Sequence, residues 1–233
     1  MAPGRRLGFD KPVRRTYFIT GTDTGVGKTV LAALWVRYLR RRGGQAAALK
    51  PVGSGGRADA RLLRAAMDGA LPLAEINPWH FRAPLAPRLA ARRERKSLHR
   101  AEVAAGIRAA QKKFDVLLVE GAGGLLSPLG EDFNSRDLIA ALGATPVIVA
   151  PNRLGVVNHV LLALEALPRR AAAAARVVLM SPASTDAAGR ANAGLLAEET
   201  RARVFVMPWL GEAVSLAGAL RQARVRRVLA ALG

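Results

Sequence analysis

Short apolar runs rich in β-branched residues alternate along this chain with longer amphipathic runs, and this alternation restricts the fold more than any other feature. It predicts parallel β-strands joined by helical crossovers. Several short runs, VLLV, VIVA and VVLM, lack polar alternation, which is typical of strands covered by helices on both faces. The expected strands lie at residues 17–20, 46–50, 116–120, 146–150, 177–180 and 204–207, and the expected helices at 28–42, 59–68, 98–113, 135–142, 156–167, 189–201 and 215–232.

We therefore expect an α/β fold, a three-layer sandwich with a mostly parallel central sheet flanked by helices. The chain of 233 residues is long enough for one domain with a large core, and we assign that domain to residues 16–233. Residues 1–15 are basic and lack the apolar segment of a secretory signal, so we expect a flexible extension there. The proline-rich stretch 71–96 is expected to be an ordered, functional excursion from the sheet.

The composition is strongly basic, with 36 lysines and arginines against 17 acidic residues and a formal net charge of +19. Such a charge raises the question of a nucleic-acid partner. The basic residues are mostly arginines scattered over helix faces, without the interleaved aromatic residues that single-strand binding favours. A general arginine and alanine bias accounts for this pattern, so we do not expect nucleic acid as a partner.

Two absences narrow the class of protein. No apolar run reaches the length of a membrane span, so we expect no membrane partner. The chain has no cysteine, which excludes disulfides, thiolate metal sites and cysteine nucleophiles. The lack of cysteine also fits a reducing compartment, and we expect a cytoplasmic protein.

Residues 16–29, TYFITGTDTGVGKT, join an expected strand to an expected helix. They end in the Gly-Lys-Thr of a P-loop NTPase, although the standard pattern G-x-x-x-x-G-K-[ST] would place its first glycine at residue 22 rather than at Gly21. The backbone N–H groups of such a loop, and the helix that follows, attract phosphate. Lys28 is then expected to reach the nucleotide phosphates, and the Thr29 hydroxyl suits Mg²⁺.

Polar residues also follow other expected strands, at the edge where ligands bind in a parallel sheet. Lys50 would either neutralise a transferred phosphoryl group or extend to solvent at the sheet rim. Asp59 would either cap the next helix or bind Mg²⁺. Glu120 ends an apolar strand, where an unpaired carboxylate is costly, so we expect it to bind Mg²⁺. Gly155 and Asn158 would either cap a helix or form a second anion site.

Five motifs, GTDTGVGKT, KPVGSG, VEGAGG, RLGVVNH and MPWLGE, occur in this order over residues 16–212, and together they resemble the dethiobiotin synthetase family. The segment NPWHFRAPLAP resembles that family too. The phosphate loop of that family has five residues between its first glycine and the glycine of Gly-Lys-Thr, and this chain has the same number. The resemblance implies that 7,8-diaminopelargonic acid (DAPA), CO₂ and ATP are joined to dethiobiotin, ADP and phosphate. It also implies a carbamate, then a carbamic-phosphoric anhydride, and Mg²⁺ as cofactor.

Matching positions carry the family's site residues onto this chain. Lys28 and Lys50 would be catalytic and stabilise the phosphoryl group and carbamate, while Ser54 would contact DAPA. The implied Mg²⁺ ligands are Thr29, Asp59 and Glu120. The DAPA carboxylate would reach a helix start of the other subunit of a homodimer, at Leu154, Gly155 and Asn158. The implied contacts with ATP and its Mg²⁺ are Gly25, Val26, Gly27, Lys28, Thr29, Val30, Asp59, Glu120, Gly121, Ala122, Gly123, Ser181, Pro208, Trp209 and Leu210.

Among the departures of the chain from the family pattern, two concern the nucleotide loop and the adenine site. Some members carry glutamate where this chain has Gly25. The family often has an Asn-Asp pair after its fifth strand that reads adenine, whereas this chain has Met180, Ser181 and Pro182. The preference for one nucleotide base therefore stays open.

A ParA/MinD-like partition ATPase is the main alternative, because it shares the expected fold and can bind DNA through basic surfaces. Its loop usually reads K-G-G where this chain has Thr20, Gly21 and Thr22. A cobyrinate-type amidotransferase would need a cysteine nucleophile, which is absent. A binding module without catalysis would have no use for Lys50 and Glu120.

Overall fold

A six-stranded parallel sheet forms the centre of the computed structural model, which describes residues 14–212 and 215–233. The strand order is β2-β5-β1-β6-β7-β8, and every neighbouring pair is parallel. These strands are β1 Arg15–Gly21, β2 Ala46–Leu49, β5 Val116–Glu120, β6 Thr145–Pro151, β7 Arg176–Met180 and β8 Arg203–Met207. All six coincide with expected strands, and the α/β sandwich fold is confirmed.

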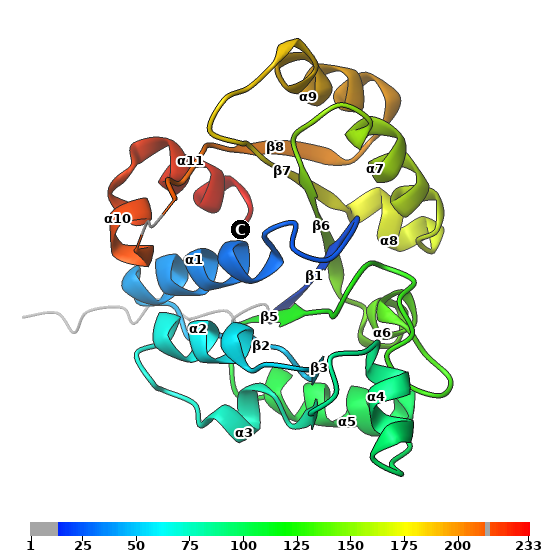
Figure 1. Ribbon diagram of the computed structural model, residues 1–233. Helices are drawn as coiled ribbons and strands as arrows, with labels where there is room; N and C mark the ends of the chain where they lie inside the picture. Colours follow the sequence, from blue (N-terminus) through cyan, green and yellow to red (C-terminus); the bar gives the residue numbers. More distant parts are fainter. Residues whose placement is uncertain (1–13, 213–214) are drawn as a thin grey trace, which may run out of the picture.

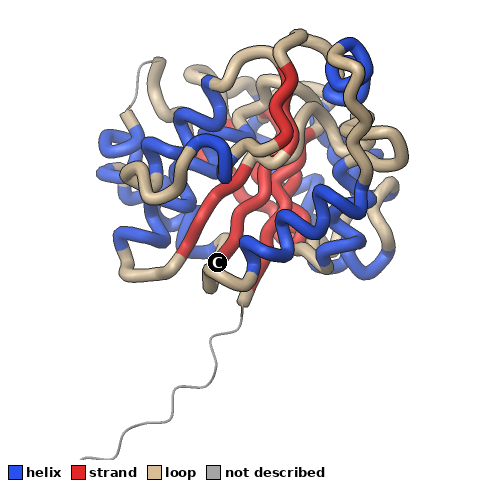
Figure 2. Tube along the Cα trace, turned by 90° about the horizontal axis from the view of Figure 1, so that it is seen from below, coloured by secondary structure: helices blue, strands red, loops and turns tan. Residues whose placement is uncertain are grey.

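Helices cover both faces of the sheet (Figure 1 and Figure 2). One layer consists of α1 Lys28–Arg41, α2 Ala58–Ala66, α10 Leu216–Arg221 and α11 Ala223–Ala231. The other consists of α5 Arg100–Gln111, α6 Ser135–Leu142, α7 Val156–Glu165, α8 Arg169–Ala174 and α9 Ala187–Glu199. The two layers follow from the right-handedness of the crossovers between parallel strands. A crossover to the next strand in one direction along the sheet places its helix on one face, and a crossover in the other direction places its helix on the opposite face. In the described ranges, no helix is long and apolar enough to cross a membrane.

The core lies on both faces of the sheet, and on one face it includes α1, whose residues 31–36 are six consecutive buried residues. A helix buried over a full turn needs neighbours on all sides, and the sheet, α2, α10 and α11 supply them (Figure 1). Trp35 is fully buried, and its ring centroid lies 4.6 Å from that of Tyr17 on β1. This packing fixes the start of α1, and with it the loop before α1, against β1.

The stretch 71–96 is ordered, as expected, but it contains elements that the sequence pattern did not indicate. It holds α3 Leu73–Ile76, β4 Trp79–Phe81 and α4 Pro87–Arg93, and β4 pairs in parallel with β3 Val52–Ser54 to form a second, two-stranded sheet. Strands of three residues are too short to show a period. The excursion has a structural role, because Asn77 Nδ2 donates to the backbone oxygen of Lys50, whose own N–H donates to Ile76.

Other boundaries differ from those expected. The predicted helix 215–232 was wrong as a single element: Gln222, with φ −69° and ψ 121°, separates α10 from α11. The sequence pattern also missed α8, whose N-cap is Pro168. Strand β1 begins at Arg15, one residue before the expected domain start, and residues 1–13 of the predicted flexible extension lie outside the described residues. Strand β2 ends at Leu49, so Lys50 lies just beyond it.

Replacing Trp35 tests the packing of α1. We expect Trp35→Ala to lower the free energy of unfolding by about 3–5 kcal/mol, because it leaves a large cavity under the helix. The indole N–H of Trp35 is buried without a hydrogen-bond partner in the described structure. Trp35→Phe removes that donor and is expected to cost less than about 1.5 kcal/mol. Denaturant unfolding measures both variants, and equal losses would contradict this account.

Candidate active site

The loop between β1 and α1 is shaped by three glycines. Gly25 and Gly27 have φ of 74° and 97°, in the left-handed region that favours glycine. At position 21, a Cβ would lie 2.7 Å from Val26 Cγ2, which is closer than atoms can pack. The first glycine is therefore required at residue 21, where the chain folds back on itself. Gly27 is the N-cap of α1 and no side chain caps it, so the first N–H groups of the helix face the loop.

Lys28 opens α1 and its side chain lies over this loop. The residue is only 6% exposed, and its ammonium donates to the backbone oxygen of Asp23 at 2.6 Å. Burial lowers the pKa of Lys28 below its ordinary value, against the attraction of Glu120. A cation held in this place is positioned for phosphate oxygens on the loop.

Lys50 lies at the centre of a cluster of charged groups drawn from three elements. Its ammonium donates to Glu120 Oε1 at 2.8 Å and to Asp59 Oδ2. The hydroxyl of Thr29 donates to the same Glu120 oxygen at 2.7 Å. Lys50 is therefore not a rim lysine extended to solvent. Asp59 is the second residue of α2 rather than its N-cap, which is Arg57, so its carboxylate is directed to Lys50 instead of capping the helix.

Lys50 and Asp59 hold each other in their ionised forms, whereas burial raises the pKa of Glu120 above its ordinary value against the attraction of Lys50. Burial alone would lower the pKa of Lys50, but Glu120 and Asp59 together raise it above its ordinary value. Burial likewise acts to raise the pKa of Asp59, and the Lys50 charge and hydrogen bond bring it below its ordinary value. Lys50 is consequently protonated at neutral pH. Removing either partner would leave a charge of the opposite sign in a poorly solvated place.

The residues around Lys50 fit a magnesium ion bound together with nucleotide phosphate. The Thr29 hydroxyl and the Glu120 and Asp59 carboxylates are hard oxygen donors of the kind that Mg²⁺ takes alongside phosphate and water. The second oxygen of Glu120 is buried and has no hydrogen-bond partner in the described part of the chain. Within the same residues, no group of three or more His, Asp or Glu side chains could hold a metal alone. A cation here would depend on oxygens from the ligand.

The loop and the cluster border one cleft of about 760 Å³ at the carboxyl edge of the sheet. Two further segments form its walls: the glycine loop after β5 and residues 84–87 of the excursion. Ser54 lines the cleft, and its hydroxyl donates to the backbone oxygen of Leu85, which joins the second sheet to that wall. Most of the expected site residues lie here: Gly25, Gly27, Lys28, Thr29, Val30, Lys50, Ser54, Asp59, Glu120, Ala122 and Gly123.

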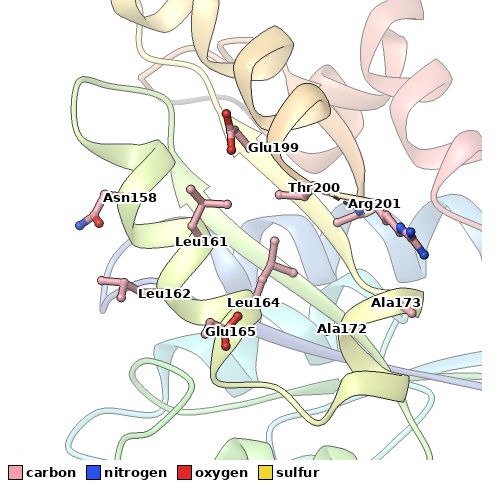
Figure 3. A pocket seen from close by; sticks show the side chains of 11 residues that line it. Asn158, Leu161, Leu162, Leu164, Glu165, Ala172, Ala173, Glu199, Thr200 and Arg201 are labelled. Carbon is pink, nitrogen blue, oxygen red and sulfur yellow. Dashed lines mark hydrogen bonds between the residues drawn. The ribbon is translucent and has the colours of Figure 1, made fainter.

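Three expected substrate residues lie outside the cleft of this chain. Leu154, Gly155 and Asn158 surround the start of α7 and do not line the cleft. Leu154 is 78% exposed, and Gly155 is the N-cap of α7 without a side-chain cap. Asn158 borders a different hollow, of about 510 Å³, between α7, α8 and the segment before β8 (Figure 3). Their contact with a substrate held by another subunit stays a prediction.

The residues expected on the nucleotide base side follow β7 and β8. The backbone N–H of Ser181 donates to the backbone oxygen of Met207 at 3.0 Å. Trp209, which follows Met207 by two residues, is 44% exposed. None of Ser181, Pro208, Trp209 and Leu210 lines the cleft. Met180, which sequence reasoning did not assign to the site, lies against the phosphate loop, because a Cβ at position 27 would lie 3.2 Å from its Cε.

Comparisons with known proteins indicate the family to which this chain is similar. A family model described as an AAA domain matches residues 15–215. An ATP-dependent dethiobiotin synthetase of Anaeromyxobacter dehalogenans is 43% identical over 84% of this chain and 90% of its own length. The one from Ralstonia nicotianae is 39% identical over 68% of this chain and 73% of its own.

Among solved structures, a ParA family ATPase from Chlorobium tepidum matches with a TM-score of 0.56 over 94% of this chain and 97% of that chain. Its sequence identity is 13%, so this likeness shows the fold alone. The relatives in sequence are similar over most of both chains, and on that basis the chain belongs to the ATP-dependent dethiobiotin synthetase family.

Proposed function

We propose that this enzyme carboxylates DAPA and closes it to the cyclic urea of dethiobiotin, with ATP converted to ADP and phosphate. One observation supports this most directly: Lys50 lies between Glu120 and Asp59 in the cleft that begins at the phosphate loop. Two lysines, two carboxylates and a hydroxyl therefore line one cleft, and an acceptor oxygen is proposed to meet the γ-phosphate among them. No side-chain nucleophile is required, which agrees with a chain that has no cysteine.

The proposed reaction has three steps. One amine nitrogen of DAPA bonds to the carbon of CO₂ and loses a proton, giving a carbamate. A carbamate oxygen attacks the γ-phosphorus of ATP, the bond from that phosphorus to the bridging oxygen of ADP breaks, and a carbamic-phosphoric anhydride forms. The second amine attacks the anhydride carbon, phosphate leaves, and the ring closes with loss of a proton. Positioning and charge stabilisation supply the catalysis in such phosphoryl transfers.

Lys50 is proposed to contact both reacting groups. A protonated lysine has three N–H donors, and two of those of Lys50 face Glu120 and Asp59. The third donor is proposed to contact the carbamate oxygen that attacks, and to stabilise negative charge as the phosphoryl group moves. The two carboxylates keep the ammonium charged and fix its direction.

Lys28, Thr29 and the loop amides are proposed to hold the β- and γ-phosphates. Lys28 now donates to the Asp23 backbone oxygen, and a short movement of its flexible side chain would bring the ammonium to a phosphate oxygen. Mg²⁺, when bound by Thr29, Asp59 and Glu120, would neutralise charge on the phosphates. Trp209, with Pro208, Leu210 and Ser181, is proposed to contact the base.

A homodimer with shared sites is part of the proposal. The start of α7 offers uncapped backbone N–H groups, which favour a carboxylate. Because Leu154, Gly155 and Asn158 do not line the cleft of their own subunit, they would serve the substrate of a second subunit. The ParA-like alternative has only the fold in its support, since the match in structure is distant in sequence.

The proposed reaction predicts that phosphate release requires both DAPA and bicarbonate. Steady-state phosphate release, measured with each component omitted in turn, checks this, and mass spectrometry of the product identifies dethiobiotin. ATP turnover that ignores DAPA and is stimulated by DNA would contradict the proposal and favour a partition ATPase. The same assay with CTP, GTP and UTP measures the base preference.

Lys50→Ala is expected to lower turnover by at least about 10²-fold, the size of effect seen when a donor to transition-state charge is removed. ATP should still bind, because the loop, Lys28 and Thr29 remain. Turnover is measured beside ATP affinity by calorimetry, and thermal unfolding confirms that the variant folds. Unchanged turnover would show that Lys50 has no part in the reaction.

Asp59→Asn is expected to raise the Mg²⁺ concentration needed for half-maximal turnover by about 10-fold or more, because one anionic ligand is lost. Asp68→Asn is the matched control. Asp68 follows the far end of α2, where it pairs with Arg37 at 3.3 Å, so its loss should leave the Mg²⁺ requirement unchanged. Equal responses of the two variants would place Mg²⁺ away from Asp59.

A further inference from the structure

The two helical layers differ in charge, and the helices of one layer carry far more net positive charge than those of the other. Helices α1, α2, α10 and α11 pack side by side on one face of the sheet (Figure 1). We call the outer surface of these four helices the basic layer. Their basic residues number ten, namely Lys28, Arg37, Arg40, Arg41, Arg61, Arg64, Arg221, Arg224, Arg226 and Arg227, against one acidic residue, Asp59. Lys28 and Asp59 line the cleft, so the surface itself carries nine arginines.

The opposite layer is almost balanced. Helices α5 to α9 contain six basic residues, Arg100, Arg108, Arg136, Arg169, Arg170 and Arg190, and five acidic residues, Glu102, Asp137, Glu165, Glu198 and Glu199. A uniform arginine bias would have affected both layers alike. The sequence alone indicated such a bias, but the distribution of acidic residues between the layers does not follow from it.

The arginines of the basic layer are largely without acidic partners. In the described structure only Arg37 among the nine forms an ion pair, with Asp68. Arg61, Arg64, Arg224 and Arg227 are exposed. Like charges gathered on one face repel one another and destabilise the folded state, unless a polyanion neutralises them.

The chemistry of the layer favours one kind of polyanion. Arginine forks match phosphate oxygens in pairs, as in nucleic-acid recognition. None of the exposed large apolar residues of the described chain lies on these four helices, so the layer has no side chains to insert into a membrane. Its aromatic residues are Trp35, which is fully buried, and Tyr38, which is partly buried, so bases have no platform on which to stack.

From these observations we propose that the basic layer binds the phosphate backbone of duplex nucleic acid, without base specificity. The contacts run from the C-terminal part of α1 across α2 on one side and across α10 and α11 on the other. The layer is separate from the cleft, so binding requires no nucleotide and does not stimulate ATP turnover. This second property distinguishes the proposal from a partition ATPase.

Fluorescence anisotropy with a short mixed-sequence DNA duplex tests the proposal on the full chain without nucleotide. The test variant carries Arg64→Glu, Arg224→Glu and Arg227→Glu in the basic layer. The matched control carries Arg100→Glu, Arg169→Glu and Arg170→Glu in the opposite layer, which changes the net charge equally. We expect the test variant to bind the duplex at least about 10-fold more weakly. The slope of log K against log salt concentration should become shallower by about 2–3, since each lost phosphate contact contributes about 0.9 to that slope.

The control variant should bind nearly as tightly as the unaltered protein, and both variants should unfold at similar temperatures and release phosphate at the unaltered rate. Three results would overturn the proposal: equal weakening in the two variants, tighter binding to a single strand of the same length, or binding to phosphatidylserine vesicles but not to the duplex. Stimulation of ATP turnover by the duplex would assign the surface to a partition mechanism instead.

Discussion

The ion pairs of Lys50 with Glu120 and Asp59 are the interaction on which the rest of the site depends. Glu120 is 1% exposed at the end of a buried strand, and a carboxylate in that place is tolerated only with a charged partner. The strand order supplies that partner, because β2, β5 and β1 are neighbours and end at the same edge. Lys50 follows the first, Glu120 ends the second, and Thr29 follows the loop after the third.

The loop and the excursion both follow from this arrangement. The phosphate loop turns sharply to bring Thr29 onto Glu120, and the absence of a Cβ at Gly21 and the left-handed conformation of Gly25 allow that turn. On the other side, Asn77 holds the backbone of Lys50 from the excursion. The chemistry proposed for the cleft thus needs support from residues far outside the nucleotide loop.

Sequence reasoning placed all six strands of the large sheet, because each is a short apolar run that differs clearly from the longer amphipathic runs around it. It could not place β3 and β4, whose three residues each are ordered by pairing with one another rather than by a pattern of their own. Nor could it tell whether Asp59 caps a helix or binds Mg²⁺, since both need a carboxylate near a helix start, and it gave no sign of the pair with Lys50. The contact of Met180 with Gly27 joins the end of β7 to the phosphate loop. These segments are far apart in the sequence, so no local pattern indicates that contact.

The distribution of charge over the surface is the property that is hardest to infer from the linear sequence. Along the chain, arginines occur everywhere, and only the crossovers decide on which face each helix lies. The first crossover puts α1 in one layer, and the C-terminal helices return to it, so arginines from both ends of the chain become neighbours. Inside the cleft, by contrast, two lysines face two carboxylates and the charges balance locally. The basic layer therefore contributes to the long-range field of the molecule, whereas the cleft attracts phosphate through short, directed contacts.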